Sequence, residues 1–134
     1  MSEVRDILLE TTNKIMKDLS TKEVITEVEN GKWPSELWNT LEETGITGIS
    51  IPEEKHGSGG TLGDALSVLQ TAGYYAAPVP LAETMLAKWI LSSCGITIPT
   101  GPLVIVTHSQ GNTVRFKKSS KGWTISGLAK KVPW

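Results

Sequence analysis

The spacing of apolar residues changes once along this chain, near Gly101, and this change limits the folds available to it. Before Gly101, apolar residues recur with the 3.6-residue period of helices. After Gly101 they alternate with polar residues, the two-residue period of strands. The sequence therefore predicts an α+β chain, with an amino-terminal helical bundle over residues 1–100 and a truncated antiparallel β segment over residues 101–134.

Five stretches of the first hundred residues carry a helical apolar stripe and stop at small or turn-forming residues. The expected helices cover residues 3–19, 20–30, 34–45, 61–73 and 81–94. Whether the first two are one bent helix stays open at this stage. Residues 46–52 alternate between apolar and polar positions and predict a short extended segment. Residues 53–60 are polar and contain three glycines, which predicts a loop.

The β segment is expected to hold three strands. Leu103–Thr107 is an apolar run long enough for a buried strand, and alternating positions around Phe116 and Ile125 indicate two more. Residues 108–112 and 118–122 have the composition of turns. Three short strands are near the minimum for an independent sheet. We therefore interpret residues 101–134 as the opening of a β domain that is cut short.

The charge distribution is uneven, and it bears on the choice of partner. Residues 1–60 carry 6 basic and 12 acidic side chains, whereas residues 101–134 carry 6 basic side chains and no acidic one. A basic segment can indicate nucleic-acid binding. Here the charges fall in turns, and the aromatic residues between them occupy strand positions, so we expect a solvated surface and no nucleic acid. No apolar run approaches the ~20 residues of a membrane helix, so no membrane partner is expected.

The sequence shows no catalytic motif and no metal-binding motif, so we expect no catalytic residue and no metal site. His56 and His108 lack a second ligand at metal-binding spacing. The single cysteine, Cys94, excludes a disulfide framework and favours a reducing cytoplasm. A glycine cluster at 57–60 precedes a helix, as in phosphate-binding loops, but the rest of such a motif is missing, which favours a simple turn. Residues 74–78 could wall a pocket, although core packing is the commoner fate of such a segment.

Residues 38–75 carry a set of features in a fixed order. They are Gly45, Gly48, Pro52-Glu53-Glu54, the glycine cluster at 57–60, and Asp64. This pattern resembles the amino-terminal domain of the acyl-CoA dehydrogenases, and the likeness in layout extends over residues 3–95. The resemblance implies a three-part enzyme with a helical domain, a middle β domain and a second helical bundle. Such enzymes use FAD to remove hydrogen from Cα and Cβ of an acyl-CoA thioester.

The resemblance also implies roles for particular residues. The family's catalytic base lies in the carboxy-terminal bundle, so this 134-residue chain is expected to be inactive alone. It would supply a wall of the acyl pocket, through Tyr74, Tyr75, Ala77, Leu81 and Met85. Positions expected to bind FAD are Val106, Thr107 and Pro133. The implied partners are acyl-CoA and the rest of the dehydrogenase, or a partner subunit, in an oligomer.

A second hypothesis comes from the same comparison with the family pattern. After Thr107 the family's glutamate and Ser-Asp pair are missing, and Pro133 stands where a threonine is usual. Some members of the family are paired subunits of which one has lost its flavin site. The chain could therefore be a non-catalytic subunit or fragment that acts as a protein-interaction module in a heteromeric dehydrogenase.

Overall fold

The computed structural model describes residues 3–106, 113–130, 132 and 134. They form two compact units, one within Met1–Leu103 and the other within Val104–Trp134. The first unit contains the helices α1 (Glu3–Leu19), α2 (Lys22–Glu29), α3 (Ser35–Glu43), α4 (Leu62–Tyr74) and α5 (Leu81–Ser93), with two short 3-10 turns, η1 (Ile46–Gly48) and η2 (Glu53–Lys55). The second unit contains the strands β1 (Thr113–Ser119) and β2 (Gly122–Leu128). The predicted α+β class, with helices first and an antiparallel β segment after them, is confirmed.

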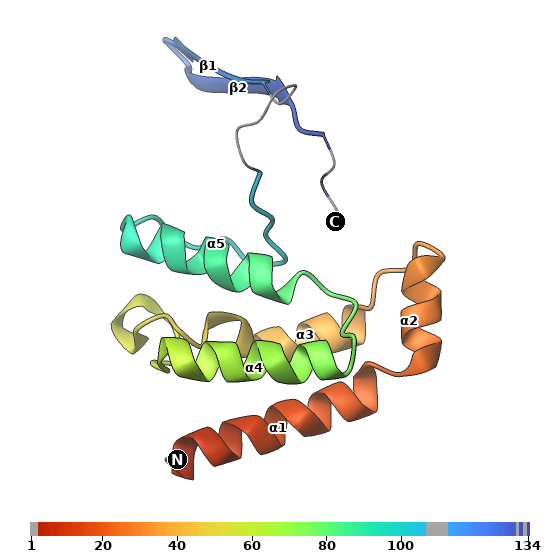
Figure 1. Cartoon of the computed structure of the whole chain (residues 1–134). Helices are drawn as coiled ribbons and strands as arrows, with labels where there is room; N and C mark the ends of the chain where they lie inside the picture. The colour runs from red at the N-terminus through yellow and green to blue at the C-terminus, as the bar shows by residue number, and fades with distance from the viewer. Residues whose placement is uncertain (1–2, 107–112, 131, 133) are drawn as a thin grey trace. The chain divides into compact units, whose positions relative to one another are not determined.

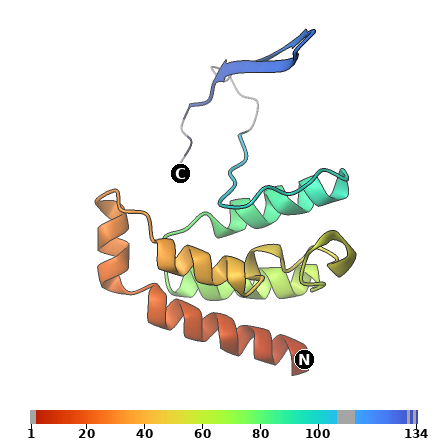
Figure 2. The ribbon, with the colours of Figure 1, turned by 180° about the vertical axis from the view of Figure 1, so that it is seen from behind.

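The helical unit is built in layers. Helix α1 packs against α3 and α4, and α5 packs against α4 and η1 on the other side (Figures 1 and 2). Helix α2 stands at an angle to the others and connects α1 to α3 (Figure 1). The core of the unit includes fully buried side chains, and the largest hydrophobic ones are Met16, Leu37, Leu41, Ile46, Ile51 and Val68. Burying a side chain of this size contributes roughly 1.5–3 kcal/mol, so this core supplies most of the folding energy of the unit.

Helices α1 and α2 are separate, which answers the question that the sequence left open. Helix α1 ends before Ser20, whose hydroxyl donates a hydrogen bond of 3.1 Å to the carbonyl oxygen of Tyr75. Thr21 then caps α2, because its side-chain oxygen accepts a hydrogen bond from the backbone N–H of Val24. The cap fixes the start of a new helix and allows the chain to change direction.

The prediction of an extended segment over residues 46–52 is wrong. Gly45 has a left-handed backbone (φ 73°), and the chain after it forms the 3-10 turn η1 instead of a strand. The turn is held by hydrogen bonds from the N–H groups of Gly48 and Ile49 to the carbonyl oxygens of Gly45 and Ile46. The apolar residues of the segment are buried by these turns, without a neighbouring strand. The loop expected over 53–60 is also partly ordered, as η2.

The glycine cluster packs tightly against this turn, and this leads to a stability prediction. A Cβ atom at Gly57 would overlap the main-chain carbonyl of Ile51, whereas a Cβ at Gly73 in α4 has open space around it. We expect Gly57→Ala to lower the free energy of unfolding by about 2 kcal/mol through overpacking. Gly73→Ala should instead raise it by about 0.5 kcal/mol, since alanine favours helix. Urea unfolding of both variants checks this, and equal effects would contradict the packing described.

The β unit is a hairpin with one apolar face. Strands β1 and β2 pair antiparallel, with Phe116 opposite Ile125 and Lys118 opposite Trp123. Both strands lie where the alternating pattern predicted them. Residues 103–106 are not in a strand, so the first expected strand is not found in the described part of the segment, and Thr107 lies outside the described residues. Among the described residues, the sheet contains β1 and β2 alone, so residues 103–106 pair with no described strand.

Among the helices within the described residues, we find none that has both the length and the apolar content to span a membrane.

Candidate functional site

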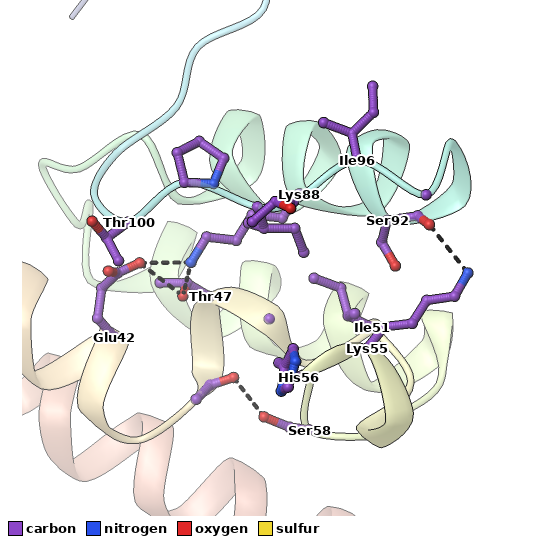
Figure 3. Close-up of a pocket in the computed structure, with 16 residues that line it drawn as sticks. Glu42, Thr47, Ile51, Lys55, His56, Ser58, Lys88, Ser92, Ile96 and Thr100 are labelled. Carbon is purple, nitrogen blue, oxygen red and sulfur yellow. Dashed lines mark hydrogen bonds and ion pairs between the residues drawn. The ribbon is translucent and has the colours of Figure 1, made fainter.

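A cavity of about 470 Å³ lies in the helical unit beside the carboxy-terminal half of α5. Its lining comes from the end of α3, from η1, from the loop over residues 51–58, from α5 and from residues 95–100 (Figure 3). We call it the α5 cavity. Its volume is within the range of small-molecule sites, roughly 300–1,000 Å³.

A buried polar cluster lies in the lining of the α5 cavity. Lys88 Nζ lies 2.7 Å from Glu42 Oε1 and donates a hydrogen bond of 2.8 Å to Thr47 Oγ1 (Figure 3). Thr47 in turn donates to Glu42 Oε1 at 3.1 Å. Helix α3 supplies Glu42, η1 supplies Thr47 and α5 supplies Lys88, so the cluster ties three elements together.

The cluster changes the acidity of Glu42. Partial burial raises the pKa of Glu42, but hydrogen bonds and the charge of Lys88, with smaller contributions from Gly101 and Thr47, outweigh it. The net result is a Glu42 pKa below its usual 4.5. Because the folded state favours the carboxylate, this group contributes stability above about pH 4.5 that is lost as the pH falls through the folded pKa.

Residues 95–103 are held against the helices by hydrogen bonds to two side chains, Glu42 of α3 and Thr84 of α5. Glu42 Oε2 accepts a hydrogen bond of 3.3 Å from the backbone N–H of Gly101. Thr84, fully buried in α5, accepts a hydrogen bond of 2.9 Å from the N–H of Leu103 and donates one of 3.0 Å to its carbonyl oxygen. This segment therefore has a defined course along α5, and part of it forms a side of the α5 cavity.

The mouth of the α5 cavity carries further polar groups. Lys55 Nζ donates a hydrogen bond of 3.1 Å to the carbonyl oxygen of Ser92, near the end of α5 (Figure 3). Ser58 Oγ donates to the carbonyl oxygen of Gly45 at 2.9 Å. His56 has a left-handed backbone (φ 63°) and ends η2. In the described part of the chain we find no group of three His, Cys, Asp or Glu side chains that could hold a metal ion. His108 lies outside that part.

The residues predicted to form the acyl-pocket wall lie together at the junction of α4 and α5, away from the lining of the α5 cavity. The Tyr74 ring is 83% exposed and packs edge-to-face on Tyr75, with 5.0 Å between ring centroids. The Tyr75 hydroxyl donates to Asn13 Oδ1 at 2.8 Å. Tyr75 and Ala77 pack against the hydrophobic core, and Leu81 and Met85 are part of it.

Of the three positions predicted to bind FAD, the structure describes only Val106. Thr107 and Pro133 lie outside the described residues. Val106 is described, and its aliphatic side chain is exposed and outside any strand. The role of these three positions in binding FAD therefore stays a prediction.

Asp64, part of the family-like pattern, has a structural role at the start of α4. Its carboxylate accepts hydrogen bonds from the N–H and hydroxyl of Thr61 at 2.8 and 2.7 Å, and it pairs with Arg5 at 2.6 Å. The Thr61 side chain accepts from the Asp64 N–H in return, which completes a capping box. The hydrogen bonds from Thr61, with the help of Arg5, lower the pKa of Asp64 to about 2.

This cap predicts how α4 responds to acid. Since the folded pKa of Asp64 is lowered, its contribution to stability is complete above about pH 3.8 and is lost as the pH falls towards 2. We expect a carboxyl-carbon NMR titration to give a pKa of about 2 for Asp64. Thr61→Ala should move it upward more than Arg5→Met does, because Thr61 supplies the larger effects. An Asp64 pKa unchanged by Thr61→Ala would contradict the capping box.

The sequence reading missed the Glu42–Thr47–Lys88 cluster. The available signal was a single lysine, Lys88, within an otherwise mostly apolar helical stretch, since such a lysine is rarely buried without a partner. The partner could not be predicted from the sequence, because Glu42 lies 46 residues away and contacts Lys88 only in the folded chain.

Comparisons with known proteins agree with the family-like pattern. The family profile "Acyl-CoA dehydrogenase, N-terminal domain" matches residues 2–96. "Acyl-CoA dehydrogenase IpdE2" of Mycolicibacterium smegmatis is 40% identical over 103 residues, which cover 74% of this chain and 33% of that protein. The protein of the same name from Mycobacterium tuberculosis is 45% identical over 56 residues, or 41% of this chain and 18% of that protein. No solved structure matches the chain significantly.

The chain thus spans at most a third of the length of these two relatives. The profile match covers the helical unit almost completely, including all five helices and both 3-10 turns. The chain belongs to the acyl-CoA dehydrogenase family, and residues 2–96 are its N-terminal domain.

Proposed function

We propose that this chain is the amino-terminal part of an FAD-dependent oxidoreductase that introduces a double bond between Cα and Cβ of an acyl-CoA thioester. The observation that carries the proposal is the match of residues 2–96 to the N-terminal domain of the family. Two relatives that bear the name acyl-CoA dehydrogenase support it. The catalytic base and most of the flavin site would come from the rest of the dehydrogenase or from a partner subunit.

In this proposal the chain contributes a wall to the acyl pocket. The exposed ring of Tyr74 and the half-buried Ala77 would contact the acyl chain. Tyr75, Leu81 and Met85 would form the packed layer behind them, because they lie against or within the core. Such a wall binds and orients the acyl group and excludes water, while the flavin supplies the redox chemistry when it is bound. The single cysteine favours the cytoplasm as the compartment.

The visible absorbance spectrum of the purified gene product tests the proposed function. The purified gene product, together with any subunit that co-purifies with it, should show flavin absorbance that bleaches anaerobically on addition of an acyl-CoA. It should also reduce an electron-acceptor dye. The 134-residue chain alone should show no turnover. A colourless gene product that binds no acyl-CoA would contradict the proposal.

A second candidate function is a non-catalytic docking subunit of a heteromeric dehydrogenase. It is favoured by exposed apolar side chains on α5 and on one face of the hairpin, namely Leu86, Trp89, Ile90, Phe116, Trp123 and Ile125. Exposed apolar patches of this kind mark surfaces that are covered by a partner. Light scattering that shows a clean monomer at high concentration, with no partner co-purifying, would count against this candidate.

A further inference from the structure

The α5 cavity has more positive than negative charge in its lining. Two ammonium groups, of Lys55 and Lys88, and one carboxylate, of Glu42, line it. Glu42 and Lys88 compensate each other at 2.7 Å. Among the described residues no carboxylate lies within ion-pair distance of Lys55, whose hydrogen-bond partner is the neutral carbonyl of Ser92. The cavity therefore carries one uncompensated positive charge at its mouth.

Lys88 also leaves a hydrogen-bond donor without an acceptor. An ammonium group has three N–H donors. Those of Lys88 meet Glu42 Oε1 and Thr47 Oγ1, and no third acceptor lies within hydrogen-bond distance among the described residues. The residue is only 9% exposed, and it lines the cavity. A buried donor without an acceptor is costly, so an acceptor in the cavity would be stabilised there.

The rest of the lining mixes polar side chains with apolar walls, and its polar members include His56, Ser58, Ser92, Thr97 and Thr100. The apolar part of the walls comes from Ile51, Ile96, Ile98 and Pro99. Three glycines, Gly45, Gly48 and Gly95, also line the cavity. Ile96 is 55% exposed, although it lies beside the cavity. An apolar body in the cavity would cover part of this surface and gain the free energy of burying it.

We propose that the α5 cavity binds a small organic carboxylate with a short apolar body. The anionic charge matches the uncompensated ammonium of Lys55, and the apolar body matches the isoleucine walls. Lys88 lies beside Glu42 and Thr47 on the other side of the lining (Figure 3), so the carboxylate is assigned to Lys55 alone. None of the residues predicted to wall the acyl pocket lines this cavity, so the proposal does not depend on the proposed function.

The test is an NMR titration of the ¹⁵N-labelled 134-residue chain with three probes. Hexanoate carries both the charge and the apolar body, 1-hexanol carries the body alone, and acetate carries the charge alone. We expect saturable shifts with hexanoate in the amides of residues 45–58 and 95–100, and weaker binding of the other two probes. Hexanoate shifts confined to other parts of the chain, or equal affinity for hexanoate and hexanol, would overturn the proposal.

Two variants with matched controls locate the contacts. Lys55→Gln should weaken hexanoate binding by about fivefold, which is the upper range for an exposed ion pair, whereas Lys17→Gln on α1 should leave it unchanged. Ile96→Ser should also weaken binding, and Ile7→Ser, at a residue 58% exposed on α1, should not. These four positions are exposed or at the rim, so the variants should keep the fold. Hexanoate affinity that is unchanged in both Lys55→Gln and Ile96→Ser would overturn the proposal.

Discussion

Replacing Lys88 with methionine should lower the free energy of unfolding by about 3 kcal/mol at neutral pH. The Lys88 side chain is 11% exposed, and its removal leaves the Glu42 carboxylate partly buried without its cation. Breaking a buried ion pair by removing one partner typically costs about 3–5 kcal/mol. Because Glu42 keeps some contact with water, we expect a value at the lower end. Urea unfolding followed by circular dichroism measures it.

The control is the same substitution at an exposed pair. Lys32 and Glu27 lie 2.8 Å apart with both side chains more than half exposed, so Lys32→Met should cost less than about 1 kcal/mol. In the double variant Glu42→Gln, Lys88→Met, the buried charge is gone and the glutamine oxygen can still accept from Gly101. Most of the stability should return. Equal losses in Lys88→Met and Lys32→Met would contradict the buried cluster.

The loss in Lys88→Met should also depend on pH. In the natural chain, the lowered pKa of Glu42 favours folding above about pH 4.5, and this contribution is lost as the pH falls through the folded pKa. Without Lys88, burial is the largest influence on Glu42, and it raises the pKa. The carboxyl group then becomes neutral in the folded variant on acidification. The difference in stability between the two proteins should therefore shrink below about pH 4.

Leu41→Ala should destabilise the helical unit by about 3 kcal/mol. Leu41 lies on α3 between the layers, and its side chain is completely buried among core residues. Truncation removes buried methyl groups and leaves a cavity, which in cores typically costs about 2–5 kcal/mol for this substitution. For a unit of about a hundred residues, such a loss lowers Tm by more than about 10 °C, which differential scanning calorimetry measures.

The matched control is Leu66→Ala on α4, because Leu66 is a helical leucine with an exposed side chain. It should change the free energy of unfolding by less than about 1 kcal/mol. If Leu66→Ala were as destabilising as Leu41→Ala, the layered core described above would be wrong, and the apolar face of α4 would be buried in solution by another molecule.

The helices were predictable because their signals are local. The apolar spacing and end residues of 61–73 and 81–94 place two helices within one residue of α4 and α5. The turn after Gly45 was not predictable from alternation alone, because Ile46, Ile49 and Ile51 can be buried by either a strand or successive tight turns.

The polar cluster of the α5 cavity could not be predicted from short stretches of sequence, because its members are far apart in the chain. Glu42 and Lys88 each have a helical neighbourhood that predicts only an exposed or half-buried charge. Their meeting depends on how α3, η1 and α5 pack, which no short pattern encodes. The same holds for Thr84, whose hydroxyl fastens Leu103 from 19 residues away. Long-range polar contacts of this kind require the structure.

In the proposed function, the junction of α4 and α5 would form a wall of an acyl pocket. Photolabelling of the purified gene product with an acyl-CoA that carries a photoreactive group on its acyl chain tests this most directly. We expect the label in the peptide that contains Tyr74–Leu81, and we expect excess unlabelled acyl-CoA to suppress the labelling. Labelling that unlabelled acyl-CoA suppresses, but that is confined to peptides without this junction, would contradict the proposed pocket wall.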